Sequence, residues 1–136
     1  MSPVFVFRLG PHQVSVLASD VRATAERPPL SPVPGAPPWL LGLWNWLGQP
    51  LAIVDIGVVG GLLRRPTPPD HVIGVQTEYG LVGFAATGIA PTREAKVPSK
   101  ARGLFDLIDA EQNLLYLDLR RACRAIDTAM IEEARR

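Results

Sequence analysis

The stretch from Pro28 to Leu63 carries a single charged residue, Asp55, and this feature most limits how the chain can fold. A segment this apolar can cross a membrane, lie in a protein core, or form a face that holds another protein. Gly48-Gln49-Pro50 interrupts it, and proline would remove a hydrogen bond from a membrane helix, while Asp55 would be costly in hydrocarbon. The stretch therefore favours two buried strands, at residues 43–47 and 51–56, joined by a turn at Gly48-Gln49.

Length and composition indicate one turn-rich domain. The chain has 136 residues, enough for a domain that buries roughly two-thirds of the surface its unfolded chain exposes. Its 14 prolines and 12 glycines favour an all-β protein with many turns. With 14 basic and 13 acidic side chains, the formal net charge is +1, so no long-range field selects nucleic acid or an anionic membrane. We therefore expect local shape to select the partners.

Two further features bear on the cellular compartment. The single cysteine, Cys123, excludes an internal disulfide and a zinc site built from thiolates. Residues 1–10 lack the basic and long apolar regions of an export signal. We therefore expect a cytoplasmic protein without direct membrane insertion.

One polar, proline-rich segment, residues 64–70, is interpreted as a linker between two lobes within the single domain, 1–136. The first lobe, residues 1–63, is expected to open with a hairpin of strands at 4–9 and 14–17, and residues 19–25 fit either a helical turn or a strand. Each lobe has enough short strands for a small barrel.

The second lobe, residues 71–117, is expected to continue the pattern of short strands and turns, with residues 91–100 polar and exposed. Apolar residues from Leu119 to Met130 recur at helical spacing and predict a C-terminal helix over about 118–134. The predicted strands of this lobe are at 71–77, 81–86, 103–108 and 114–119.

Residues capable of catalysis are few and isolated. His12 and His71 have no ligand or carboxylate at helical spacing beside them, and Cys123 lies on the apolar stripe of the terminal helix. No phosphate-binding, dinucleotide or nucleophile motif occurs. Asp55 and Asp118 are interpreted as structural groups that accept backbone N–H bonds, Asp118 as a helix cap. We therefore expect no enzyme, no metal and no cofactor.

All three tryptophans lie within eight positions of one another. Trp39 and Trp44 are expected in the core, whereas Trp46 precedes the turn, where a large aromatic side chain is expected to be partly exposed and to anchor a partner.

These residues resemble a known family. The segment PGAPPWLLGLWNWLGQPLAIVDI, residues 34–56, resembles the core signature of CheW, the bacterial chemotaxis coupling protein. That signature has a Pro-x-x-Pro-x-Trp, a glycine, an Asn-Leu-Arg-Gly turn, and an apolar strand ending in Asp-Leu. FVFRLGPHQVSVL is similar to the opening hairpin of the family, LVGFAA to a strand of its second lobe, and NLLYLDLRRAC to its closing strand and helix.

The resemblance implies a mainly β fold of two SH3-like, five-stranded barrels that share a hydrophobic core, with a C-terminal helix. It also implies a non-enzymatic adaptor that links chemoreceptor cytoplasmic tips to the regulatory domain of a CheA-type histidine kinase, in the cytoplasm and recruited to membrane receptor arrays. The expected partner-binding residues are Ala23, Asn45, Trp46, Leu47 and Gly48. The expected structural motif is Pro34, Pro37, Trp39, Gly42, Asp55 and Asp118.

The chain departs from the family pattern at charged positions. Leu47 stands where the family commonly has arginine, Ala23 where it has glutamate in a Val-x-Glu pattern, and Thr87 where the second lobe often has aspartate. If positions 23 and 47 face each other, an apolar pair replaces a polar one, which avoids a lone desolvated charge. We interpret the chain as a divergent coupling protein, for chemotaxis or a related pilus-type or chemosensory pathway.

Two other functions remain open from the sequence. A small-barrel module that binds a ligand or nucleic acid would require an exposed groove with basic and aromatic side chains. A membrane-inserted protein would require the segment at 39–63 to form a helix.

Overall fold

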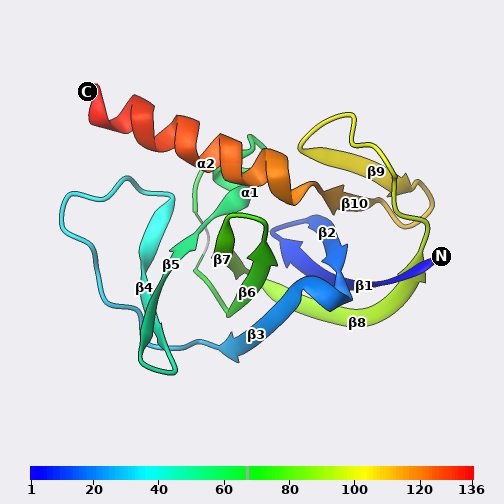
Figure 1. Ribbon diagram of the computed structural model, residues 1–136, viewed down its shortest axis with the longest axis horizontal. Helices are drawn as coiled ribbons and strands as arrows, with labels where there is room; N and C mark the ends of the chain where they lie inside the picture. Colours follow the sequence, from blue (N-terminus) through cyan, green and yellow to red (C-terminus); the bar gives the residue numbers. More distant parts are fainter. Residues whose placement is uncertain (67) are drawn as a thin grey trace.

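Two five-stranded sheets form the body of the protein in the computed structural model, which describes residues 1–66 and 68–136 (Figure 1). The first, sheet A, has the strand order β8 (Gly88–Ala95), β1 (Ser2–Leu9), β2 (His12–Leu17), β10 (Leu114–Leu117) and β9 (Phe105–Asp109). The second, sheet B, has the order β3 (Val21–Glu26), β6 (His71–Thr77), β7 (Gly80–Ala86), β5 (Gln49–Val54) and β4 (Leu40–Trp46).

Both sheets follow the same plan. Three antiparallel strands meet a two-stranded hairpin through one parallel contact, which joins β2 to β10 in sheet A and β7 to β5 in sheet B. Each sheet curls into a half-barrel, and in sheet A an ion pair of 2.8 Å between Arg93 Nη2 and Asp109 Oδ2 links its two edge strands. The predicted mainly β, SH3-like architecture is confirmed.

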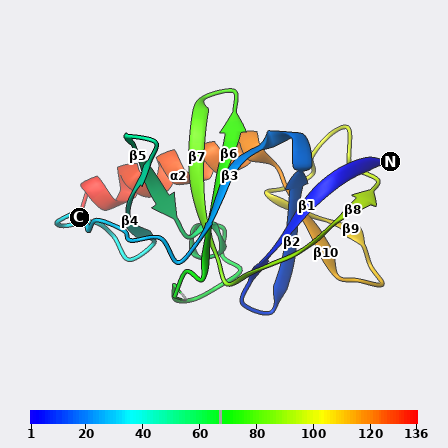
Figure 2. The same cartoon turned by 90° about the horizontal axis from the view of Figure 1, so that it is seen from below.

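The described residues also form three helical segments: a 3-10 turn (Ala18–Asp20), α1 (Ile56–Val59) and α2 (Leu119–Ala134). Helix α2 begins beside sheet A, where β10 ends, and extends past sheet B (Figures 1 and 2). Among the described residues, no helix is long and apolar enough to cross a membrane. The apolar segment at 39–63 forms β4, β5 and α1, so the membrane-helix alternative is wrong.

The lobes predicted from the sequence do not coincide with the two sheets. Strands β1 and β2 precede residues 64–70 but pair with β8 and β10, which follow them. Strands β6 and β7 follow the same segment but belong to sheet B. The predicted linker therefore connects two strands of one sheet, and Thr67 within it lies outside the described residues.

Several predicted elements are confirmed and one is corrected. The opening hairpin pairs Val4 with Leu17. Residues 19–25, which fitted either a helical turn or a strand, contain both: 19–20 belong to the 3-10 turn, and 21–25 belong to strand β3, whose burial alternates. Residues 91–100 were expected to be an exposed polar segment, but 91–95 belong to the edge strand β8. A register shift opposite Val4 and Val6 accommodates Pro91 there, since bulges and edge strands tolerate proline.

The central core lies between the two sheets. Phe7 and Val14 from sheet A and Ile73 and Phe84 from sheet B belong to one buried cluster, to which Ala122 of α2 contributes. Each of these side chains is fully buried. The two half-barrels therefore share a hydrophobic core, as the resemblance implied.

Candidate partner-binding surface

The tip of the β4–β5 hairpin consists of Leu47 and Gly48, because Trp46 pairs with Gln49. Both tip residues have positive φ, 52° and 81°, which defines the tight turn that fits the twist of a hairpin. The turn thus lies one residue earlier than predicted. Asparagine or glycine usually takes such a position, since a left-handed backbone costs an ordinary L-residue roughly 1–2 kcal/mol. Leu47 is also 87% exposed, so local stability does not explain a leucine there.

The side chains behind this tip form an apolar cluster inside sheet B. Trp44 and Leu51 are buried in it, with Ala23 and Trp46 packed against it, and the ring centroids of Trp44 and Trp46 are 6.5 Å apart. Ala23 and Trp46 both pack against this cluster, and Leu47 is not among the described residues that do so. Of the expected binding residues, only Asn45, Leu47 and Gly48 are exposed, whereas Ala23 and Trp46 are half-buried.

The proline-tryptophan part of the motif fixes the path of the chain into β4. Pro37 and Trp39 are buried and Pro34 is exposed. Gly42 has a φ of 146°, and an added Cβ would lie 2.7 Å from the carbonyl oxygen of Ser31, so only glycine permits this approach. Ser31 and Leu43 exchange backbone hydrogen bonds of 2.9 and 2.8 Å, which hold the proline-rich loop against β4.

The two motif aspartates are helix caps. The Asp55 carboxylate accepts the N–H of Val58 at 3.1 Å, and the Asp55 N–H donates to the Trp39 carbonyl at 2.8 Å. The Asp118 carboxylate accepts the N–H of Arg121 at 3.0 Å at the start of α2. Both residues have the structural role predicted for them, because each satisfies a backbone donor at a helix start.

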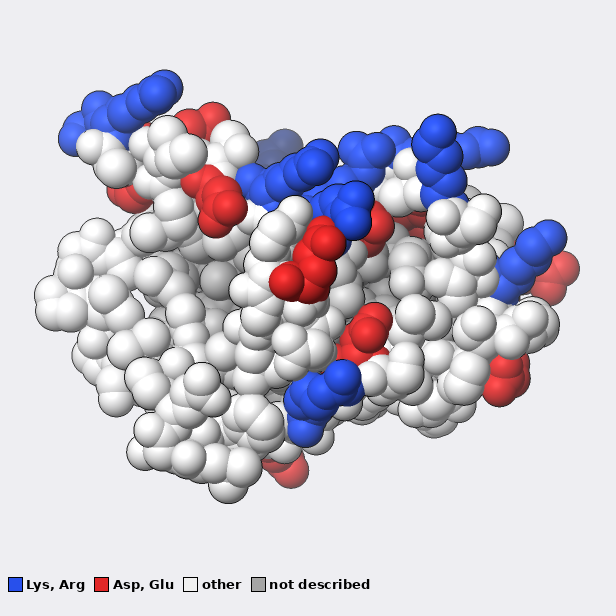
Figure 3. Space-filling view, in the orientation of Figure 1, with Lys and Arg blue, Asp and Glu red and all other residues white. Residues whose placement is uncertain are grey.

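An apolar groove opens between sheet B and α2, with a volume of about 310 Å³. In Figure 3 the surface below the helix is hollowed and almost free of charged side chains over the left half of the view. We call this the α2 groove. Its lining residues are Leu51, Ala52 and Val54 of β5, Tyr79, Leu81 and Val82 of the β6–β7 hairpin, and Cys123, Ile126 and Asp127 of α2.

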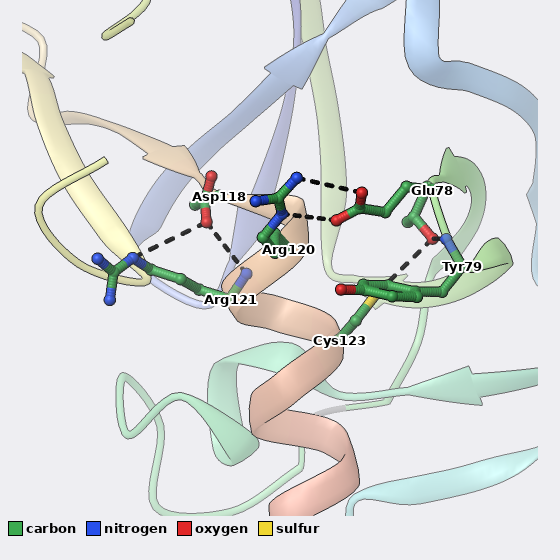
Figure 4. A network of polar contacts seen from close by, with 7 residues as sticks. Glu78, Tyr79, Asp118, Arg120, Arg121 and Cys123 are labelled. Carbon is green, nitrogen blue, oxygen red and sulfur yellow. Dashed lines mark hydrogen bonds and ion pairs between the residues drawn. The ribbon is translucent and has the colours of Figure 1, made fainter. Parts of the chain in front are cut away.

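Polar contacts hold the β6–β7 turn against α2 beside this groove (Figure 4). Arg120 binds the Glu78 carboxylate through two hydrogen bonds, Nε–Oε1 of 2.6 Å and Nη2–Oε2 of 3.1 Å. These bonds lower the pKa of Glu78 and raise that of Arg120. The buried Thr77 hydroxyl donates to the Gly80 carbonyl, accepts the Tyr79 N–H, and lies 3.7 Å from Cys123 Sγ.

Cys123, in the wall of the groove, is a poor nucleophile. Burial raises the pKa of the Cys123 thiol, which keeps it protonated and weakly nucleophilic at neutral pH. No group of three or more His, Cys, Asp or Glu side chains within 1–66 and 68–136 is placed to hold a metal ion. The exposed features of this surface are an apolar hairpin tip and an apolar groove.

Among known protein families, the model of the CheW-like domain matches residues 3–105, about three-quarters of the chain. The chain belongs to the CheW-like family. Its fold is similar to the crystal structure of the scaffolding protein TtCheW from Thermoanaerobacter tengcongensis, with a TM-score of 0.69 over 86% of this chain and 88% of that one, at 15% identity. No protein with a curated description matches the sequence.

Within this CheW-like chain, the sequence did not reveal the α2 groove. Cys123 and Ile126 were recognised as part of an apolar helical stripe, but the groove that they line together with β5 and β7 depends on the tertiary fold. The exposed Tyr79 lies in a predicted turn, and no sequence motif marked it as a binding residue. Among the groove residues, the sequence alone identified only the apolar character of the strands and the helix.

Proposed function

We propose that this CheW-like protein is a non-enzymatic scaffold that couples the regulatory domain of a CheA-type histidine kinase to the cytoplasmic tip of a chemoreceptor, in chemotaxis or a related pilus or chemosensory pathway. Family membership supports a chemotaxis scaffold. A scaffold of this kind works in the cytoplasm, where receptors recruit it to membrane arrays.

One observation identifies residues that support the proposal. Leu47 holds a strained, left-handed backbone at the tip of a hairpin and leaves 87% of its side chain exposed. A single exposed leucine is common on protein surfaces, but this one is kept at a position that costs backbone energy, which a role in an interaction surface explains and local stability does not. Trp46 supports the tip from behind, since it packs on the cluster inside sheet B. We infer that this hairpin contacts the kinase domain or the receptor.

The test is co-elution of the full chain with the kinase regulatory domain and with a receptor tip fragment from the same organism. Leu47→Arg should weaken one of these complexes by at least about tenfold and leave the unfolding midpoint unchanged. Trp46→Ala should weaken the same complex, with some loss of stability because the ring is half-buried.

Gln112→Arg provides a matched control, since it places the same charge at the exposed turn between β9 and β10 of sheet A. It should bind like the wild type. A well-folded protein that bound neither fragment would refute the proposed function. A large stability loss in Leu47→Arg would instead make the turn part of the core.

The alternative, a binder of small ligands or nucleic acid, has little support on this surface. The α2 groove has apolar walls and a carboxylate, and lacks basic side chains among its lining residues. A basic recess near the start of α2, lined by Lys100, Arg121 and Arg124 among others, has no aromatic side chain in its lining. Stacking of bases requires both features in one place.

A further inference from the structure

Asp127 is the one carboxylate in the otherwise apolar lining of the α2 groove. It is exposed, and no ion pair joins it to any of the described residues. Glu78, whose neighbour Tyr79 lines the groove, is already paired with Arg120. An apolar surface that carries one unpaired negative charge is complementary to an apolar surface that carries one positive charge.

The strands that border the groove indicate what kind of segment fits it. Strands β5 and β7 are interior members of sheet B, whose edges are β3 and β4. Residues 53–54 of β5 already pair with 83–84 of β7. An added strand needs a free sheet edge, so the groove is better suited to a segment that contributes side chains and satisfies its own backbone, which is a helix.

Helix α2 extends the apolar wall by one turn beyond the groove. Met130 and Ile131 lie four residues after Ile126 and Asp127, so they continue the same face of the helix. Their side chains are 43% and 54% exposed. The combined apolar surface is longer than the groove itself. The groove has a volume of about 310 Å³, which accommodates side chains rather than a large ligand.

We propose that the α2 groove binds an amphipathic helix of a partner protein, with apolar side chains entering between α2 and β5 and a lysine or arginine of that helix pairing with Asp127. The inference rests on the proposed scaffold function, and it adds a second docking surface with a defined partner chemistry to the one at the β4–β5 hairpin. The two surfaces share strand β5, since Leu51 belongs both to the cluster behind the hairpin tip and to the lining of the groove.

The experiment uses the full chain and the helical receptor tip fragment as the probe. Asp127→Lys should weaken binding by about tenfold, because it places like charges opposite each other. Glu132→Lys is the matched control, since it makes the same change in net charge at an exposed position of α2 outside the groove. A probe in which glutamate replaces a basic residue should bind the Asp127→Lys variant more tightly than the original probe does. The same altered probe should bind the wild type more weakly.

A second measurement locates the contact. A photoreactive phenylalanine derivative at Ala52, which is exposed on the groove wall, should crosslink to the helical probe. One outcome overturns the inference and leaves the proposed function standing. In it, the probe binds the wild type, Asp127→Lys and Glu132→Lys bind the probe equally well, and position 52 gives no crosslink. If the probe and the kinase domain both fail to bind the wild type, the proposed function and this inference fail together.

Discussion

At the scale of single residues, the departures from the family pattern have different structural consequences. Ala23 packs against the cluster inside sheet B, so a small apolar side chain there fits its surroundings. Leu47 lies outside that cluster and is almost fully exposed. The two positions therefore do not form the apolar replacement of an ion pair that the sequence suggested, and Leu47 requires an explanation of its own.

The strain at Leu47 gives a direct prediction about stability. Leu47→Asn should raise the free energy of unfolding by about 0.5–1 kcal/mol, because asparagine tolerates the left-handed region and Asn-Gly favours this turn. Chemical denaturation monitored by tryptophan fluorescence measures the change. Leu107→Asn, at an exposed leucine in the middle of strand β9, should give no such gain. A loss of stability in Leu47→Asn would mean that leucine packs against the hairpin.

At the scale of elements, the β6–β7 turn and α2 depend on each other. The turn supplies Tyr79 to the α2 groove and Glu78 to the ion pair with Arg120, while Thr77 lies against Cys123 of the helix. Residues more than 40 positions apart thus fix the shape of one wall of the groove. The position of the turn relative to the helix is accordingly part of the binding surface.

The Glu78–Arg120 pair predicts how this element responds to pH. Its hydrogen bonds hold the pKa of Glu78 below the ordinary value of 4.5, so its stabilisation is present above that value and is lost as the pH falls through the lower folded-state pKa. Glu78→Gln should lower the melting temperature slightly at pH 7, and the two proteins should converge in acid. High salt should also reduce the difference, since the pair is exposed.

Glu111→Gln is the control for this measurement, because Glu111 is exposed and has no ion pair with the described residues. Its melting temperature should follow that of the wild type at every pH. A difference between Glu78→Gln and the wild type that persisted unchanged at pH 2 would show that the ion pair is not its cause.

The secondary-structure elements could be predicted from the sequence better than their arrangement in the tertiary fold. Hairpins and the terminal helix follow from local periodicity and turn residues, and the caps at Asp55 and Asp118 follow from residue type. Strand β8 was not predicted because Pro91 and its charged neighbours obscure an edge strand. The α2 groove was also missed, because it forms only when β5, β7 and α2 meet.

At the scale of the whole molecule, the interleaved strands make the two half-barrels one structural unit. Sheet A takes strands from both ends of the chain, and sheet B takes the strands between them. Gly60, after α1, reinforces the junction, since an added Cβ would lie 2.5 Å from Phe105 of sheet A. A chain that shares its core in this way is expected to unfold in one cooperative transition.

This cooperativity can be measured because all three tryptophans, Trp39, Trp44 and Trp46, lie in or next to β4 of sheet B. Val16→Ala removes buried methyl groups from sheet A and should destabilise the protein by about 1–3 kcal/mol. With a shared core, tryptophan fluorescence and far-ultraviolet circular dichroism should shift to the same lower denaturant midpoint. Thr92→Ala, an exposed change in the same sheet, should leave both midpoints in place. A circular dichroism transition that shifted while the tryptophan transition did not would show that the half-barrels unfold separately.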